Sequence, residues 1–566
     1  MRVFPFLVLA VAFAACTTSS PPSTPNVAEQ AQEITEVFET PEAYSVRTLD
    51  SADIERFLGG HPEYLIDSAE IRDFYHRRHY QFAWFVNDSL SQAASGFFSL
   101  VNSADTAYRE VASVRDRLSD LLMTSQLNRQ DSLACDSCQL QLELALTAQF
   151  FRFADKKYGG IVAKDLRELD WFIPRRKKNY AQLLDSIAAG HMDLSPVEPL
   201  HPQYALLKAQ LKHYHDLDSL PWEPIVSGDL KKLLPGDSAE FVPDIRQRLM
   251  LLGDLVSEGG TIELSSTHYD SLLVKAVQRF EERHGLHPDA VIGKGVLAAL
   301  NITPQERVRT ILVNMERLRW VPERISPDLI LVNIPEFRMH VFEEGREAWN
   351  MDVVVGNSAT RTVIFSDTLK WIVFSPTWSV PASIVRNEIL PGMEKNPNYL
   401  ASKGMEIVGG SAGFPSIRQK PGAGNALGRV KFLFPNNYSI YFHDTPSKGG
   451  FAREKRDFSH GCIRLSEPRK LAEYLLRNDT AWTADSIKAA MFRGKERYVR
   501  LKEKRPVTIG YFTAWVDQEG HLNFRDDVYG LDERLAHELF AEETLALLPP
   551  DQGSGTTVIS SVSAPK

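Results

Sequence analysis

The sequence predicts an α+β multidomain protein with a mostly helical N-terminal scaffold, a small three-helix module and a mainly-β C-terminal domain that carries an inserted cap subdomain. Three observations support this prediction. Apolar residues recur at helical spacing from residue 46 to about 235, and a compact run of three helical segments follows at 237–303. A C-terminal domain is expected over 305–545, in which a helix is followed after Arg319 by an alternating apolar period typical of strands. With 566 residues the chain is long enough for about three domains.

The N-terminus predicts an export signal over residues 1–15, with a charged start, a short apolar run and small residues at its end. Cys16 follows directly, and this arrangement resembles a bacterial lipobox, which implies cleavage before Cys16 and acylation of its thiol. An ordinary signal peptide with a chance cysteine is the alternative. Residues 16–45 are expected to be a polar tether. The lipobox implies an exported, periplasmic lipoprotein held in a cell-envelope membrane, with the outer membrane expected because Thr17 is no aspartate-type retention signal.

The remaining composition is that of an ordinary globular protein. The net charge of -9 is spread along the chain, without the basic stripe expected of a nucleic-acid partner. Cys135 and Cys138 have the spacing of a small local disulfide in a loop before a helix, with two unpaired thiols as the alternative; a four-ligand zinc site would need a second pair. Residues 550–566 are predicted to be disordered.

The helical region, 46–235, shows two clear amphipathic helices. Asp67 begins the first, which carries Ile71, Phe74 and Tyr75 at helical spacing. The second is expected over 139–153, with one apolar side made of Leu142, Ala145, Ala148 and Phe151. These stripes predict core packing and indicate no chemistry.

The segment 237–303 is expected to form three helices around a small core. The apolar positions in register are Ile245, Leu249 and Leu252 in the first helix, Leu273, Ala276, Val277 and Phe280 in the second, and Val296, Leu297 and Leu300 in the third. A unit this small buries little core of its own, which is typical of a binding module.

The C-terminal region reads as an antiparallel β domain. Strands are predicted at 329–334, 338–343, 351–355 and 368–374, with a hairpin turn at Glu344 and Gly345. A break of nearly 50 residues, 380–428, interrupts the strands, and its length predicts a lid or binding loop. Trp378, Ile389 and Tyr399 argue against a disordered insertion here, and residues 386–393 are expected to be partly helical.

Two short segments near the C-terminal end carry the candidate chemistry. On a strand that ends at His443, Ile440 and Phe442 share the core face, so His443 points to the opposite face. In the second segment Ile463 and Leu465 are apolar, so Cys462 and Arg464 point together away from the core. We therefore expect the thiol and the guanidinium to be neighbours.

This arrangement predicts an activated cysteine. A nearby base and a positive charge favour the nucleophilic thiolate, His443 is suited to take the proton, and Gly461 lets the backbone amides converge on an oxyanion. Acyl transfer on an amide is the chemistry that these groups support. The alternatives are a buried small cysteine, a zinc site of His443, His460 and Cys462, and, for the His460 side chain, a structural role.

The motif resembles the active-site signature of the L,D-transpeptidases, in which a histidine is followed after an interval by Ser-His-Gly-Cys and an apolar residue. Here fifteen residues separate His443 from Ser459. The three-helix unit is similar to the peptidoglycan-binding modules of cell-wall enzymes. The whole organisation resembles the large, YcbB-like branch of the L,D-transpeptidase family, whose catalytic domain is a β-sandwich.

The resemblance implies roles for particular residues. Cys462 would be the nucleophile and His443 the general base and acid. The backbone of His460, Gly461 and Cys462 would form the oxyanion hole. Either the carboxylate of Asp444 or a backbone carbonyl would orient the imidazole, and the sequence leaves this open. The side chains expected to contact the substrate are Tyr441, Ser459, Arg464 and Trp378.

The implied reaction is peptidoglycan remodelling without a metal or cofactor. Cys462 would attack the bond between meso-diaminopimelate and the terminal D-alanine of a tetrapeptide donor stem, and the acyl group would pass to the diaminopimelate amine of a second stem as a 3→3 cross-link. Acylation by carbapenems is also implied. Water as the acceptor would make the protein an L,D-carboxypeptidase, and a lysine of an envelope protein would make it an anchoring enzyme. A non-catalytic wall-binding lipoprotein is the alternative of another class.

Overall fold

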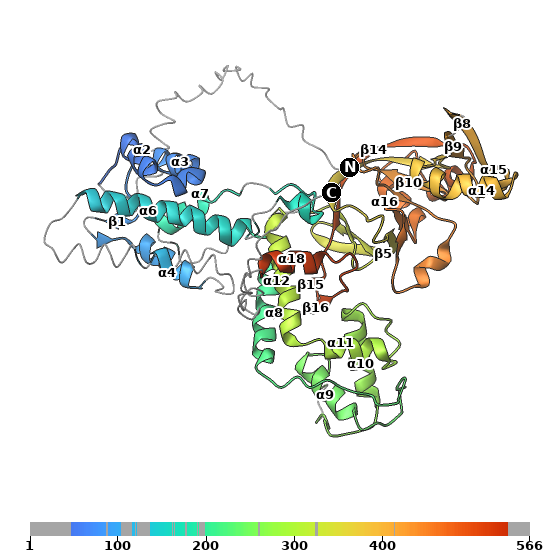
Figure 1. The fold of residues 1–566 in the computed structure, drawn as a ribbon, viewed down its shortest axis with the longest axis horizontal. Coiled ribbons are helices and arrows are strands. Elements are labelled where there is room, and N and C mark those ends of the chain that lie inside the picture. Colours follow the sequence, from blue (N-terminus) through green and yellow to red (C-terminus); the bar gives the residue numbers. More distant parts are fainter. Residues whose placement is uncertain are drawn as a thin grey trace, which may run out of the picture. The chain divides into compact units, whose positions relative to one another are not determined.

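The computed structural model describes residues 47–86, 89–103, 116–118, 120, 136–160, 162, 165–175, 178–189, 191, 198–257, 261–322, 326–411 and 414–540 (Figure 1). The chain divides into two compact units: Met1–Phe153 with Tyr180–Val197, and Ala154–Asn179 with Glu198–Lys566. The predicted signal peptide, Cys16, the tether and the disordered tail lie outside the described residues, as does Cys135. Across the described ranges, no helix is long and apolar enough to cross a bilayer.

The first unit is built mainly of helices. Its elements are α2 (Ser51–Gly60), η1 (Pro62–Asp67), α3 (Ser68–Arg77), β1 (Phe85–Val86), β2 (Ser89–Leu90), α4 (Gln92–Ser103), α6 (Asp136–Ala154, whose last residue falls in the second unit) and α7 (Ala181–Ala188). The predicted helix at Asp67 is confirmed: α3 begins after it, and Ile71, Phe74 and Tyr75 are fully buried.

Helix α6 differs from its prediction, because it is buried on almost every side instead of along one apolar stripe. Its polar side chains are satisfied within the core. The carboxylate of Glu143 accepts hydrogen bonds from the amides of Ala83 and Trp84 and from the Tyr75 hydroxyl. Cys138 lies in the first turns of this helix, and not in a loop before it.

The three-helix module is confirmed in the second unit. It consists of α9 (Val242–Leu251), α10 (Ser271–Arg283) and α11 (Lys294–Asn301). Nearly all of the predicted apolar positions, including Ile245, Leu249 and Phe280, join one buried cluster. The side chain of Asp270 caps α10 by accepting a hydrogen bond from the Leu273 amide at 2.9 Å.

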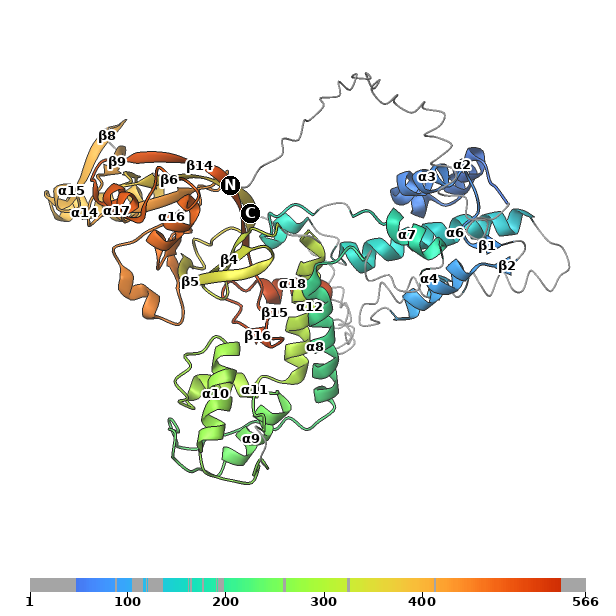
Figure 2. The same cartoon turned by 180° about the vertical axis from the view of Figure 1, so that it is seen from behind.

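Helix α12 (Pro304–Trp320) connects this module to the β domain. It begins at a capping box formed by Thr303 and Glu306, which satisfies amides of the first turn. Helix α8 (Pro202–Asp218) packs along it, and the two run side by side in both views (Figures 1 and 2). The segment with η2 (Asp155–Gly159, a π-helix) and η3 (Leu166–Leu169) also belongs to this unit.

The boundary of the helical region therefore differs from the predicted position near residue 235. Residues 154–179 and 198–235 pack with the β domain, since α8 covers α12 and Trp171 forms a bridge with Ile364. Trp171 also packs edge-on against Trp320, with ring centroids 5.4 Å apart. Helical periodicity shows that a segment is a helix, but it does not show which core the helix joins.

The β domain confirms the predicted α+β class and contains one nine-stranded mixed sheet in the order β12-β5-β13-β11-β10-β6-β14-β3-β4. An additional pairing between β4 and β5 joins the two ends of the run from β5 to β4, so these strands form a closed ring. The bounds are β3 (Ile330–Asn333), β4 (Arg338–Glu343), β5 (Arg346–Gly356), β6 (Phe365–Phe374), β10 (Val430–Leu433), β11 (Phe442–His443), β12 (Asp457–Ser459), β13 (Ile463–Leu465) and β14 (Arg497–Gly510).

Most pairings are antiparallel, as predicted, but β3–β14, β11–β13 and β5–β12 are parallel. The fully buried residues of this sheet include Val332, Ile372, Phe432, Phe442 and Ile463. The other elements are η5 (Lys448–Ala452), α16 (Pro468–Leu476), α17 (Ala484–Phe492), the hairpin β15 (Ala514–Val516) and β16 (Leu522–Phe524), and α18 (Leu531–Leu539).

The predicted cap is an ordered subdomain with its own small core. Its elements are β7 (Trp378–Ser379), α13 (Ala382–Ile384), η4 (Val385–Ile389, a π-helix), α14 (Leu390–Lys395), α15 (Tyr399–Ser402), β8 (Met405–Ser411) and β9 (Phe414–Gln419). The three strands pair in the order β7-β9-β8. Ile389 is buried in the cap core, and Trp378 and Tyr399 pack against it, which agrees with the sequence argument against disorder.

Candidate active site

The sheet register brings the two candidate segments together. Strand β11 runs parallel to β13, with His443 beside Arg464 and Phe442 beside Ile463. On its other side β11 pairs with β10, where Lys431 is the partner of His443. The imidazole is therefore flanked by two cationic residues on neighbouring strands. Arg464 was expected beside Cys462, and Lys431 was not expected at the site.

The predicted strand that ends at His443 is shorter than expected. Only Phe442 and His443 are in β11, because Ser439 adopts a left-handed backbone with φ of 58° and turns the chain just before it. Ile440 and Phe442 are buried, as the alternation predicts. His443 lies on the other side but is itself buried, with 5% of its surface exposed.

Cys462 is half-buried and is contacted mainly by the segment before β11. Its Sγ lies 3.5 Å from the Ser439 carbonyl oxygen. Burial raises the pKa of the Cys462 thiol, against the opposing effects of hydrogen bonds from the amide and hydroxyl of Tyr441 and of the Arg464 charge. Burial and the Cys462 charge raise the pKa of Tyr441, so its hydroxyl remains a donor. The Arg464 charge acts toward the thiolate, as expected, but burial outweighs it, so the resting cysteine is a neutral thiol.

His443 is held in the state that a base requires. Its Nδ1 lies 2.5 Å from the backbone carbonyl oxygen of Asp444, so Nδ1 carries the proton and Nε2 is the free acceptor. Burial, assisted by the Arg464 and Lys431 charges, lowers the pKa of His443 to about 4, and the ring is neutral at pH 7. Within the described residues, no hydrogen bond joins His443 to Cys462.

The Asp444 carboxylate has a different set of partners. One oxygen accepts from the Arg429 amide at 2.8 Å, while the other accepts from the Thr445 amide and pairs with Lys448 Nζ at 2.8 Å. Gly428 has no room for a side chain, since a Cβ there would lie 2.4 Å from this carboxylate. The choice left open by the sequence is therefore resolved in favour of the backbone carbonyl as the partner of the imidazole.

The Ser-His-Gly-Cys turn is held by its own first side chain. Ser459, which is 2% exposed, donates from Oγ to the Cys462 carbonyl oxygen at 2.6 Å and accepts from the Gly461 amide at 3.2 Å. Gly461 has a φ of 105°, which favours glycine, and its carbonyl accepts from Thr362 Oγ1 at 2.8 Å. The hydroxyl of Ser459 is thus committed to the turn, which contradicts its expected contact with substrate.

The same bond changes the expected oxyanion hole. The Gly461 amide already has Ser459 as its acceptor. The amides of His460 and Cys462, by contrast, have no acceptor within the part of the chain that the structure describes. These two amides, and not that of Gly461, are available to a developing oxyanion.

The cap reaches the site through two contacts. Trp378 in β7 hydrogen-bonds to Tyr441, the residue that also hydrogen-bonds to Cys462. His460 Nε2 lies 3.2 Å from Glu388 Oε1 in η4, and both side chains are about half exposed. The His460 ring thus lies at the surface and pairs with a carboxylate of the cap, which is compatible with the expected structural role.

Sequence reasoning missed Lys431 and Ser439, since their positions follow from the β10–β11 register and from a single left-handed residue. Among all residues that the structure describes, no group of three or more His, Cys, Asp or Glu side chains could hold a metal ion, so the zinc alternative has no geometric support. The arrangement supports nucleophilic catalysis by Cys462, with His443 nearby as a neutral base.

Comparisons with known proteins identify the domain that carries this site. A family model described as an L,D-transpeptidase catalytic domain matches residues 327–509, a range that includes both His443 and Cys462. The chain carries an L,D-transpeptidase catalytic domain. Two further models match N-terminal to it: a scaffold domain at 69–211 and a "Putative peptidoglycan binding domain" at 238–300.

A curated relative from Haemophilus influenzae, named "Putative L,D-transpeptidase", is 28% identical over 240 residues, which are 40% of this chain. The match spans 48% of that protein's own length, or about half.

Solved L,D-transpeptidases are also similar. The Stackebrandtia nassauensis enzyme is 16% identical, with 49% of this chain and 94% of that chain covered and a TM-score of 0.21. The Mycobacterium smegmatis enzyme is 14% identical, with 32% and 58% covered and a TM-score of 0.19. At these TM-scores neither structure adds to the assignment of the L,D-transpeptidase domain.

Proposed function

We propose that this protein is a cysteine acyltransferase that remodels peptidoglycan, forming 3→3 cross-links through a Cys462 thioester with release of D-alanine. The observation that carries the proposal is the pairing of β11 with β13 inside the L,D-transpeptidase domain, which sets the neutral base His443 beside the strand that begins after Cys462. The donor is a tetrapeptide stem, and the acceptor is the diaminopimelate amine of a second stem.

In the first half-reaction, Nε2 of His443 takes the thiol proton as Cys462 Sγ attacks the carbonyl carbon of the L-centre of diaminopimelate. The oxyanion binds the amides of His460 and Cys462. When the tetrahedral intermediate collapses, the C–N bond to D-alanine breaks and the imidazolium returns its proton to the leaving amine. A thioester remains on Cys462.

The second half-reaction reverses these roles. The amine of the second stem attacks the thioester while His443 removes its proton, and the thiolate of Cys462 leaves and is reprotonated. In the resting state both Cys462 and His443 are neutral, so the thiol proton moves only when substrate is bound. The substrate complex must bring Nε2 and the thiol into proton-transfer distance, because catalytic hydrogen bonds often form only there.

Arg464 is proposed to bind a carboxylate of the donor stem. Its Nε is buried and has no hydrogen-bond partner among the described residues, although the side chain lies beside both His443 and Cys462. A buried guanidinium nitrogen without an acceptor is costly, and a substrate carboxylate would satisfy it. Trp378 and Tyr441 are proposed to line the same donor site through their contact with each other.

The proposal is tested with tetrapeptide muropeptides and product analysis by mass spectrometry. A cross-linked dimer with equimolar D-alanine supports the proposed acceptor. A tripeptide product alone would show that water is the acceptor, and transfer only to an added envelope protein would show an anchoring enzyme. Absence of any product with the unmodified protein, together with binding to sacculi, would support a non-catalytic wall-binding protein. Acylation of Cys462 by a carbapenem is expected in the same assay.

The cellular location is proposed from residues outside the described part of the chain. Acylation of Cys16 would anchor an exported protein to a cell-envelope membrane, with the outer membrane expected. A Cys16→Ala variant should then move from the membrane fraction to the soluble periplasmic fraction, whereas an unchanged distribution would contradict the lipid anchor.

A further inference from the structure

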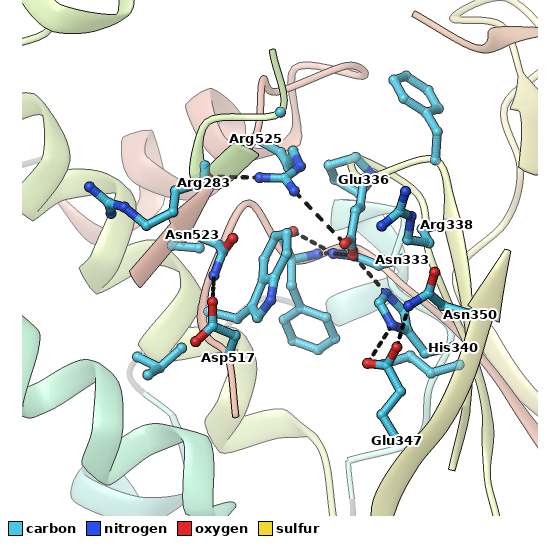
Figure 3. A pocket seen from close by; sticks show the side chains of 18 of the residues that line it. Arg283, Asn333, Glu336, Arg338, His340, Glu347, Asn350, Asp517, Asn523 and Arg525 are labelled. Atoms are coloured by element: carbon cyan, nitrogen blue, oxygen red, sulfur yellow. Dashed lines mark hydrogen bonds and ion pairs between the residues drawn. The ribbon is translucent and has the colours of Figure 1, made fainter. Parts of the chain in front are cut away.

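A large cavity lies in the second unit, apart from Cys462 and His443. Its volume is about 2080 Å³, and it is enclosed by α10 of the three-helix module, the β15–β16 hairpin and the β3–β5 part of the sheet (Figure 3). Pockets for small ligands measure about 300–1,000 Å³, so this cavity has room for a polymer segment.

The sheet wall of the cavity is a polar face of β4 and β5. Arg338 pairs with Asp352 and His340 with Asn350 in the register, and these four side chains line the cavity. His340 lies between two carboxylates, 2.9 Å from Glu336 and 3.0 Å from Glu347. Burial disfavours a charged ring, but the two carboxylates outweigh it and raise the pKa of His340 to about 9.

The opposite wall comes from the hairpin. Trp515 and Asn523 are register partners and so share one face, and Asn523 donates to Asp517 at 2.8 Å. The Arg525 guanidinium lies 4.8 Å from the centre of the Trp515 ring and 3.8 Å from Glu336. Figure 3 shows Arg525 reaching across the top between the two walls. Trp515 is half-buried, and Arg525 lies over one face of its ring.

The module is held to the hairpin, which makes the cavity a composite of both. Arg525 donates from Nη1 to the Arg283 carbonyl oxygen at 2.9 Å, at the end of α10. Gly285 has a φ of 68°, and a Cβ there would lie 2.5 Å from Arg525 Cδ. Arg283 in turn binds Asp254 of the module at 2.8 Å. The spacing of the walls is thus set by close backbone and side-chain contacts.

The charges on these walls compensate one another. Arg338 is paired with Asp352, His340 with Glu336 and Glu347, and Arg525 with Glu336. A highly charged ligand would gain little from such walls, while a neutral ligand rich in hydroxyl and amide groups could use the remaining donors and acceptors. The side chains of Arg338 and Asp352 are 42% and 34% exposed, so both can form hydrogen bonds with a ligand. The half-buried Trp515 side chain is an apolar group in the same cavity, and the ring face not covered by Arg525 is the one proposed as a platform.

We propose that this cavity binds the glycan strand of peptidoglycan, with Trp515 as the stacking platform and the β4–β5 face as the hydrogen-bonding wall. The inference rests on the proposed function for its choice of polymer. It places the binding site between the module and the catalytic domain instead of on the module alone. A strand held there would keep its stems close to the domain that carries Cys462.

The test uses the full chain with Cys462→Ala, which cannot turn over substrate. The probe is glycan strands freed of their stems by an amidase, and binding is measured by calorimetry. Trp515→Ala and Arg338→Gln should each weaken binding about tenfold or more, as expected for groups at the centre of a site. Tyr498→Ala removes an exposed aromatic ring outside the cavity and should bind like the parent. Arg338 is partly exposed, so its variant should fold even if Trp515→Ala does not.

Three results would overturn the inference: no saturable binding of stem-free strands, unchanged binding by Arg338→Gln, or displacement of the strand by free tetrapeptide. Failure of the proposed function is distinguished by a separate assay. In protein that retains Cys462, the Trp515→Ala and Arg338→Gln variants should react with soluble tetrapeptide at the rate of the unmodified protein. If the parent does not react but strands still bind, the acyl-transfer proposal fails and the binding site stands.

Discussion

His443 donates from Nδ1 to the backbone carbonyl oxygen of Asp444 across 2.5 Å, while the Asp444 carboxylate is occupied by the Arg429 and Thr445 amides and by Lys448. A main-chain acceptor can fix the tautomer of a catalytic histidine without adding a negative charge. The base is thereby oriented by a group that no side-chain substitution removes.

Replacement of the Asp444 side chain should therefore change the acylation rate very little. Asp444→Asn keeps the backbone carbonyl but only one side-chain oxygen, so one of the two amides loses its acceptor. We expect acylation by tetrapeptide within about threefold of the parent and a loss of about 1–3 kcal/mol in stability. His443→Ala should lower acylation by about 100- to 10,000-fold with the fold intact. Stopped-flow acylation and circular dichroism provide both readouts. A drop of a hundredfold or more for Asp444→Asn would show that the carboxylate orients the ring.

The pH dependence of acylation should have an unusually low acid limb. The base works when neutral, and burial lowers the pKa of His443 to about 4, so kcat/KM should be flat near neutral pH and fall only as the pH drops through about 4. An acid limb near the ordinary histidine value of 6.5 would contradict the buried neutral ring.

The pKa of the Cys462 thiol is shifted upward, in contrast to the lowered pKa of His443. Burial raises the pKa of Cys462 above its ordinary value of 9.0, so alkylation of Cys462 by iodoacetamide should be slow at pH 7 and should accelerate only above pH 9. Peptide-level mass spectrometry follows alkylation of the peptide that contains Cys462, with added glutathione as the reference thiol. Rapid alkylation of Cys462 at pH 6 would indicate a resting thiolate and an ion pair with His443.

Arg464 should affect both donor binding and the His443 pKa. Arg464→Gln removes the proposed partner of a donor carboxylate, so KM for tetrapeptide should rise roughly ten- to a hundredfold. Because the Arg464 charge also lowers the pKa of His443, the acid limb should move upward in the same variant. Lys431→Gln also removes a positive charge near His443 but leaves Arg464 Nε in place to bind the donor. It should therefore raise the pH of the acid limb with little change in KM. Unchanged KM in Arg464→Gln would refute the carboxylate site.

Ser459 should be a structural residue of the turn and not a substrate contact. Ser459→Ala loses two hydrogen bonds, one from the Gly461 amide and one to the Cys462 carbonyl, which should cost about 2 kcal/mol of stability and misplace the nucleophile. Both the melting temperature and kcat should fall, while KM changes little. Ser447→Ala, at an exposed serine nearby, is the control. A rise in KM alone would restore Ser459 to the substrate site.

Much of this fold follows from local sequence patterns. The alternation at Ile440 and Phe442 and at Ile463 and Leu465 places those side chains in the core, as the structure confirms. The three-helix module and the ordered cap are likewise determined by apolar spacing and by anchors such as Ile389.

The details of the site depend instead on non-local register and on single backbone angles. Lys431 reaches His443 only through the β10–β11 pairing, and the chain reversal at Ser439 carries no residue that demands a positive φ. The commitment of Ser459 to its own turn could not be seen either, because a serine in a motif suits substrate and backbone equally well. The helical segment 154–179 joins the second unit through Trp171, a contact that periodicity does not encode.

The most direct test of the central claim is the acyl-enzyme itself. Protein quenched in acid during turnover of a disaccharide tetrapeptide should carry the tripeptide acyl group on the peptide that contains Cys462, and neutral hydroxylamine should release it as expected for a thioester. Cys462→Ala should show neither this adduct nor a cross-linked product. An adduct on another residue, or dimer formation by Cys462→Ala, would contradict the account.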